Sequence, residues 1–81
     1  MSEAIVVGGV IAVTLNVFVK VYNEAKQMNQ YPPRVFMREA GGSTTLLFKD
    51  IDFAYSTTIL NSELDANRIK LMNVAGNLYE V

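Results

Sequence analysis

The chain has 81 residues, and its seven Lys and Arg residues against eight Asp and Glu residues give a formal net charge of −1. A chain of this length forms at most one small domain with a tail. It has no cysteine and no histidine, which excludes disulfides and thiolate metal sites and removes the commonest general base. General nucleic-acid binding needs a basic surface, which the net charge does not favour. We therefore expect a protein that is not an enzyme, holds no cofactor or metal and binds no nucleic acid.

The first element along the chain is an apolar segment, residues 4–22, whose first charged side chain is Lys20. As a helix it would be about 28 Å long at ~1.5 Å per residue, close to the ~30 Å hydrocarbon core of a bilayer. Its aliphatic side chains favour insertion, and Lys20 near the end can extend its ammonium group to the headgroups. Tyr22 and Tyr31 suit the membrane interface. The sequence therefore predicts a transmembrane helix, with membrane lipid as a partner.

Small residues recur every four positions in this segment, at Ala4, Gly8 and Ala12, and Asn16 continues the row. Residues i and i+4 lie on one face of a helix. Small side chains let two membrane helices approach closely, and an amide can form a hydrogen bond across the contact. We therefore expect these four residues to form a helix-packing interface with copies of the chain or with other helical membrane subunits.

Two other interpretations of the apolar segment remain open. Its many β-branched residues favour strands, and a buried strand pair could turn at Gly8-Gly9. Alternatively, the segment forms a helix that is buried between the subunits of a soluble oligomer.

A polar stretch, residues 23–30, keeps helical spacing and is expected to continue the helix out of the apolar zone. Tyr31-Pro32-Pro33 then ends the helix, because a proline disfavours helical geometry in the preceding residue. The predicted organisation is an apolar helix and its stem at 1–30, a joint at 31–33 and a small β-rich domain at 34–81. Lysines and arginines follow the apolar segment and none precedes it, so the positive-inside tendency places the C-terminal domain on the cytoplasmic side.

The domain after the joint is predicted to be mainly β. Residues 34–39 have the composition of a strand, and the glycines that follow them mark a turn. Residues 44–60 are rich in strand-forming side chains but exceed the usual strand length. The apolar positions change from even to odd near Phe48-Lys49, which predicts a β-bulge at that point.

Ile51, Phe53 and Tyr55 alternate with small or acidic residues, which is the period of a half-buried strand. We expect these three residues to form a docking strand for a larger protein assembly. Residues 61–67 are predicted to be a turn between this strand and two further short strands. The alternative is a helix that begins near Ser62 and ends at Gly76.

The predicted fold class is therefore α+β, with one long N-terminal apolar transmembrane helix followed by a small antiparallel β domain. This plan resembles that of type IV pilins, although no processing motif precedes the helix. The predicted function is that of a structural, membrane-anchored subunit of a larger assembly, such as a virion membrane protein, a minor capsid protein or a pilus-like filament subunit. The alternatives are an accessory subunit of a membrane enzyme or transporter, and a soluble oligomeric scaffold or capsid component that buries the apolar helix between subunits.

Overall fold

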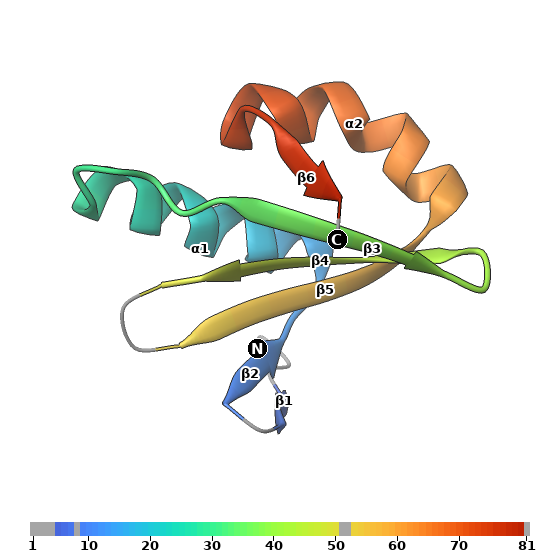
Figure 1. The fold of residues 1–81 in the computed structure, drawn as a ribbon, viewed down its shortest axis with the longest axis horizontal. Coiled ribbons are helices and arrows are strands. Elements are labelled where there is room, and N and C mark those ends of the chain that lie inside the picture. The colour runs from blue at the N-terminus through green and yellow to red at the C-terminus, as the bar shows by residue number, and fades with distance from the viewer. Residues whose placement is uncertain (1–4, 8, 51–52, 81) are drawn as a thin grey trace.

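The structure is a computed structural model that describes residues 5–7, 9–50 and 53–80. Two helices and a six-stranded mixed sheet make up the described part of the chain (Figure 1). In chain order the elements are β1 (Ile5–Val7), β2 (Val10–Ala12), α1 (Leu15–Met28), β3 (Val35–Ala40), β4 (Ser43–Lys49), β5 (Ala54–Leu60), α2 (Asn61–Ala75) and β6 (Leu78–Glu80).

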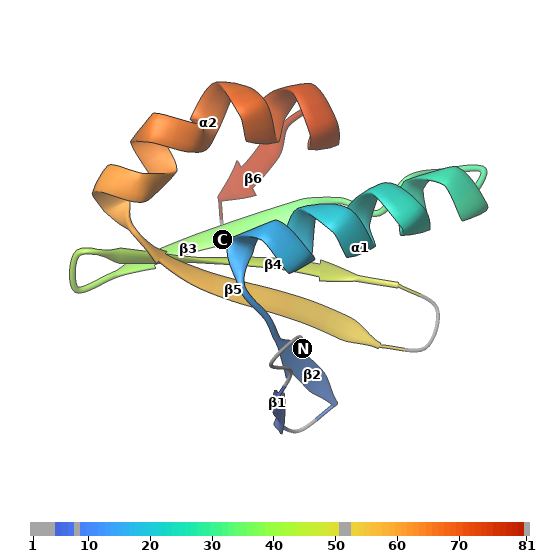
Figure 2. The same cartoon turned by 180° about the vertical axis from the view of Figure 1, so that it is seen from behind.

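The strand order across the sheet is β1-β2-β5-β4-β3-β6. Strands β3, β4 and β5 form an antiparallel meander, to which β2 is added in parallel beside β5 and β6 in parallel beside β3. Strand β1 pairs with β2 in an antiparallel hairpin at the edge of the sheet. Both helices lie on one side of strands β4 and β5 (Figures 1 and 2).

The hydrophobic core lies between the two helices and this side of the sheet. Side chains alternate between the two faces of a strand, and on β4 it is Thr44, Leu46 and Phe48 that are buried. The Phe48 ring lies 5.2 Å from the rings of both Phe18 and Tyr22 on α1, with edge-on geometry in each case. The core therefore joins residues from both sides of the Pro32-Pro33 joint.

The prediction of a transmembrane helix at residues 4–22 is wrong. No helix in the described part of the chain combines the length and the apolar character needed to cross a membrane. The segment instead contains the β1–β2 hairpin and the first half of α1, so the alternative of a strand pair is the one that the structure supports. Gly9 has a φ of +84°, a conformation that glycine adopts without steric cost.

The physical reason for this difference lies at Thr14. β-Branched residues before it favour a strand, and its side chain then accepts a hydrogen bond from the Val17 N–H at 3.4 Å, which caps α1. Phe18, Tyr22 and Ala25 follow at helical spacing and are all buried against the sheet. A membrane location for the chain is therefore not supported, and the cytoplasmic placement of the C-terminal domain loses its basis.

Residues 44–60 form a hairpin rather than one bulged strand. Strands β4 and β5 pair from Ser43↔Leu60 to Lys49↔Ala54, and the Asp50 N–H donates to the Phe53 carbonyl at 2.8 Å in the connecting loop. The buried positions do change from even-numbered on β4 to odd-numbered on β5, as predicted. The cause is that the chain reverses direction between the two strands, not a bulge within one strand. The predicted antiparallel β domain is also corrected, because two of the strand pairs, β2–β5 and β3–β6, are parallel.

The prediction of a turn and strands after residue 60 is wrong up to residue 75, where the structure has helix α2. Leu64 and Leu71 are two turns apart on one side of α2, and both are buried. Gly76 ends the helix with a φ of +76°, and its N–H donates to the Met72 carbonyl at 2.8 Å. The helical alternative, with Gly76 as its end, is therefore the correct one.

Candidate docking surface

The sheet has a second face that points away from both helices. Because side chains alternate along each strand and register is fixed by pairing, the residues of this face follow from the buried ones. We call this surface the open face. It includes Phe36 and Arg38 on β3, Thr45, Leu47 and Lys49 on β4, Ser56 and Thr58 on β5, and Tyr79 on β6. Arg34, which directly precedes β3, belongs to it through its contact with the Tyr79 ring.

An aromatic pair lies at the β3–β6 side of the open face. Phe36 and Tyr79 are direct partners across the parallel strands, and their ring centroids are 6.0 Å apart. The Arg34 guanidinium carbon lies 5.3 Å from the centre of the Tyr79 ring, within the range of a cation–π contact. Tyr79 nevertheless keeps 39% of its surface exposed. Aromatic and Arg side chains are enriched in protein interfaces, so this cluster suits contact with another molecule.

Charges on the described strands are separated between the two faces of the sheet. The basic residues Arg38 and Lys49 belong to the open face, and Arg34, just before β3, joins them there over the Tyr79 ring. The acidic residues Glu39 and Glu80 belong to the face that carries the helices, because Glu39 pairs with the buried Thr44 and Glu80 pairs with Met37. On the described strands the open face therefore carries basic charge only. A near-neutral chain thus presents a locally positive surface.

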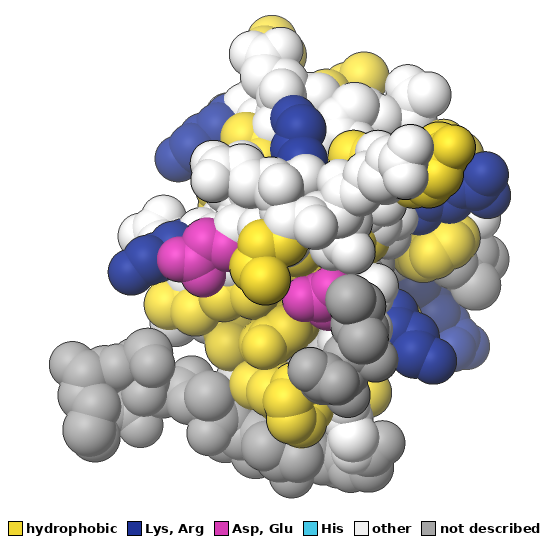
Figure 3. All heavy atoms as spheres, turned by 90° about the vertical axis from the view of Figure 1, so that its left-hand side faces the viewer, with side chains coloured by type: hydrophobic (Ala, Val, Ile, Leu, Met, Phe, Trp, Pro, Cys, Tyr) yellow, Lys and Arg dark blue, Asp and Glu magenta, His cyan; other side chains and the backbone are white. Residues whose placement is uncertain are grey.

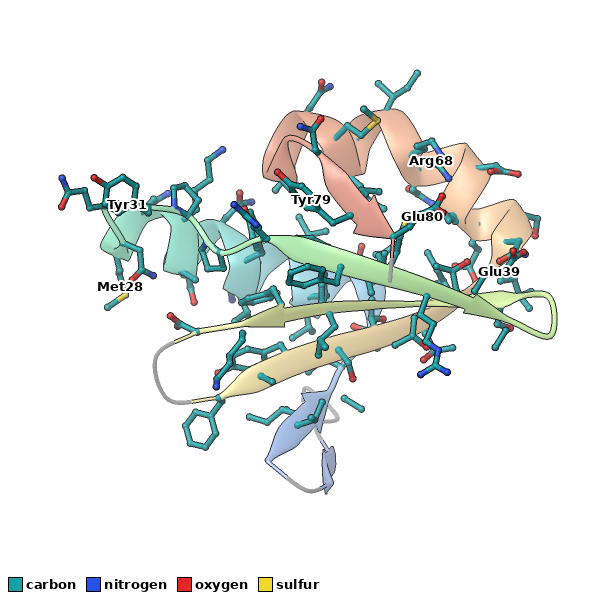
Figure 4. All side chains as sticks on the ribbon, in the orientation of Figure 1. Met28, Tyr31, Glu39, Arg68, Tyr79 and Glu80 are labelled. Atoms are coloured by element: carbon teal, nitrogen blue, oxygen red, sulfur yellow. The ribbon has the colours of Figure 1, made fainter. Side chains whose placement is uncertain are left out.

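A cavity of about 390 Å³ lies between α2 and the far end of β3. We call it the acidic hollow; its lining residues are Met37, Glu39, Thr44, Asn61, Leu64, Asp65, Arg68 and Glu80. Figure 4 shows Glu39, Glu80 and Arg68 in this region. Three carboxylates oppose one guanidinium, so the hollow is locally negative.

A chain of hydrogen bonds fixes one wall of the acidic hollow. The buried Thr44 hydroxyl donates to Asn61 Oδ1 at 2.6 Å, and Asn61 Nδ2 donates to the Glu39 carboxylate. Asn61 is the first residue of α2, and its backbone N–H donates to the Gly42 carbonyl at 3.0 Å. This network holds Glu39 in place as a charged acceptor at the rim.

Large apolar side chains are exposed where α1 ends. Met28 is 84% exposed and Tyr31 is 82% exposed. Figure 3 looks at this end of the molecule, where yellow hydrophobic side chains lie in the middle of the view with magenta acidic side chains beside them. Asn29 Nδ2 donates to the Asp50 carboxylate at 3.3 Å and so connects this end to the β4–β5 loop.

The residues of the predicted helix-packing interface do not share a helix in the described part of the chain. Ala12 is exposed on β2, whereas Asn16 is exposed in the first turn of α1. Ala4 and Gly8 lie outside the described residues. Any part that the four residues take in contacts with other chains stays a prediction.

The three residues predicted for a membrane interface have different environments. Lys20 and Tyr31 are exposed, whereas Tyr22 is only 2% exposed. The Tyr22 hydroxyl donates to the Pro33 carbonyl at 2.8 Å, and burial raises the pKa of the phenol from its ordinary value of 10.0. Tyr22 thus fastens the Pro-Pro joint to α1.

The predicted docking strand is not a single surface. Phe53 is 48% exposed in the β4–β5 loop. The Tyr55 ring instead stacks on Phe48, at a centroid distance of 5.4 Å, on the side of the sheet that carries the helices. Ile51 lies outside the described residues. The sequence therefore did not reveal the open face, because its assignment requires knowing which side of the sheet the helices cover.

Nothing in the described part of the chain groups three Asp, Glu, His or Cys residues in a way that could hold a metal ion. No family model, no curated protein and no solved structure matches the chain.

Proposed function

We propose that the chain is a non-enzymatic structural subunit that docks into a larger protein assembly through the open face of its sheet. The observation that carries this proposal is the separation of charge between the two faces. Arg34, Arg38 and Lys49 surround apolar and aromatic side chains on a surface that neither helix covers.

The composition of the open face supports a protein partner. Interface cores are enriched in aromatic residues and Arg and depleted of acidic residues. Phe36 and Leu47 are direct neighbours across β3 and β4, and both are half-buried, so they offer an apolar centre. The basic side chains at its margin would contribute to orientation and to the rate of association with an acidic partner surface.

The proposal is tested by co-fractionation in the cells that make the protein naturally. We expect the wild-type chain to elute from size-exclusion chromatography of the extract in a complex much larger than the chain itself. The variant Arg38→Glu should elute as the free chain, because a reversed charge on the open face repels the partner. The matched control is Lys70→Glu, which makes the same change of charge on the exposed side of α2.

Equal thermal melting of both variants and the wild type would show that the fold is intact. Elution of Arg38→Glu in the same complex as the wild type would contradict the proposal. So would the loss of the complex in Lys70→Glu to the same extent, because the contact would then not depend on the open face.

A further inference from the structure

We propose that the open face of one copy of the chain binds the acidic hollow of a second copy, so that the chains assemble head to tail. This inference rests on the proposed function and names the partner of the same surface. Its basis is charge complementarity between two surfaces of one molecule. On the described strands, the charged residues of the open face are all basic. The acidic hollow is lined by three carboxylates and one guanidinium.

Two open faces are not expected to bind each other. A symmetric dimer through this face would place Arg34, Arg38 and Lys49 of one copy near the same residues of its partner. Like charges that meet across an interface repel each other and oppose association. The favourable contact is therefore between different surfaces, which makes the interface heterologous.

The acidic hollow is suited to receive a basic side chain. Its volume is about 390 Å³, and Leu64 and Met37 form apolar parts of its wall. An Arg or Lys side chain has an apolar stem and a charged end, so it can pack along such a wall while its charge meets the carboxylates at the rim. The Thr44–Asn61–Glu39 network already orders one of these carboxylates, which reduces the cost of binding.

The two surfaces lie on opposite sides of the sheet, because Glu39 and Glu80 point away from the open face. A contact between them leaves one surface of each kind unoccupied in a dimer. Further copies can therefore add at both ends, and the result is a closed ring or a filament.

Sedimentation velocity of the purified full chain tests this inference. From about 10 μM to about 1 mM, a range that detects even weak association, the wild type should shift from monomer to larger species. Raising the salt concentration should weaken the shift, because salt screens the charges at the interface. Arg38→Glu on the open face and Asp65→Lys at the hollow should each weaken association at least about tenfold.

Two matched controls separate the effect of the altered surface from the effect of the altered net charge. Lys70→Glu repeats the charge change of the first variant, and Glu24→Lys repeats that of the second, both at exposed helix positions; both should associate like the wild type. A mixture of Arg38→Glu with Asp65→Lys should form dimers, because each variant supplies the surface that the other lacks. Glu80→Lys provides a second test of the hollow if Asp65→Lys lowers the melting temperature.

Three results would overturn the inference. The first is a wild-type chain that stays monomeric over the whole range. The second is association that Asp65→Lys and Glu80→Lys leave unchanged. The third is that the wild type binds a fluorescent single-stranded oligonucleotide of about 20 nucleotides and that Arg38→Glu abolishes this binding. The open face would then be a nucleic-acid-binding surface. A monomeric purified chain whose complex in cell extract is still lost in Arg38→Glu would overturn the inference and leave the proposed function standing.

Discussion

The two faces of the sheet differ in what their side chains do. On β4 the even-numbered residues meet the helices and are almost completely buried, with Leu46 and Phe48 both at 0% exposure. The odd-numbered residues of the same strand are half-buried or exposed. The charged residues that share their face on the described strands are all basic. One face therefore stabilises the fold, whereas the other is available for contact. Substitutions at adjacent positions should separate these two roles.

The largest difference is expected between Phe48 and Leu47. Phe48→Ala removes a ring that contacts Phe18, Tyr22 and Tyr55, and it should lower the free energy of unfolding by about 3–5 kcal/mol. Leu47→Ala, one residue away on the open face, should cost only about 1 kcal/mol because the side chain is half-buried. Urea denaturation measures both values. Equal losses of unfolding free energy in the two variants would mean that both faces of the sheet stabilise the fold to the same extent.

A smaller difference is expected between Thr44 and Thr45. Thr44→Val removes the buried hydroxyl that donates to Asn61, and it should destabilise the chain by about 1–2 kcal/mol. Thr45→Val removes a hydroxyl that faces Thr58 on the open face at 3.0 Å, where water can replace it, so its effect should stay within about 0.5 kcal/mol. Thermal denaturation of both variants checks the order. A larger loss for Thr45→Val would contradict the assignment of the faces.

The buried Tyr22 should make the stability of the fold depend on pH in the alkaline range. Burial raises the pKa of Tyr22 in the folded chain, so the neutral phenol is favoured by the native state. Its contribution to stability is complete below the unfolded-state pKa near 10.0 and is lost as the pH rises through the folded-state pKa. The free energy of unfolding should therefore fall above pH ~10 in the wild type.

Tyr22→Phe should remove this part of the pH dependence and should cost about 1 kcal/mol at neutral pH, because the hydrogen bond to the Pro33 carbonyl is lost. Denaturation between about pH 8 and pH 11 compares the variant with the wild type. A Tyr22→Phe variant that loses stability above pH ~10 as steeply as the wild type would refute this role.

The smallest effect on stability is expected at Arg38 on the open face. Arg38 is exposed, and Arg38→Ala should change the free energy of unfolding by less than about 0.5 kcal/mol. The same variant should weaken assembly, because the contact loses one of its basic side chains. A loss of stability above 2 kcal/mol, measured by thermal denaturation, would show that Arg38 belongs to the framework of the fold.

Parts of the fold could be predicted from the sequence because local signals agree there. Residues 34–39 were predicted as a strand, and β3 spans Val35–Ala40; the glycine turn after it has positive φ at Gly41 and Gly42. The change of phase near Phe48 correctly marked the end of one strand. Its interpretation as a bulge failed because alternation alone does not tell a bulge from a hairpin loop.

The errors occurred where one sequence pattern suits two structures. The apolar segment at residues 4–22 suits a membrane helix, but it also suits strands followed by a buried helix. In the second case only the cap at Thr14 marks where the strands end and the helix begins. In α2, Leu64 and Leu71 are buried but Ile69 is 77% exposed, so the helical periodicity is blurred in the sequence. The open face could not be predicted, because the alternation of Arg34, Phe36 and Arg38 does not tell which side the helices cover.

The most direct test of the account is the relative rate at which an acetylating reagent modifies two lysines. Lys49 lies on the open face and Lys70 on the outer side of α2, and both are exposed in the isolated chain. The ratio of their modification rates, measured by mass spectrometry, should fall at least about tenfold between the dilute purified chain and an extract of the natural source, because the partner covers Lys49. An unchanged ratio in an extract where the chain elutes in a large complex would contradict the assignment of the open face as the docking surface.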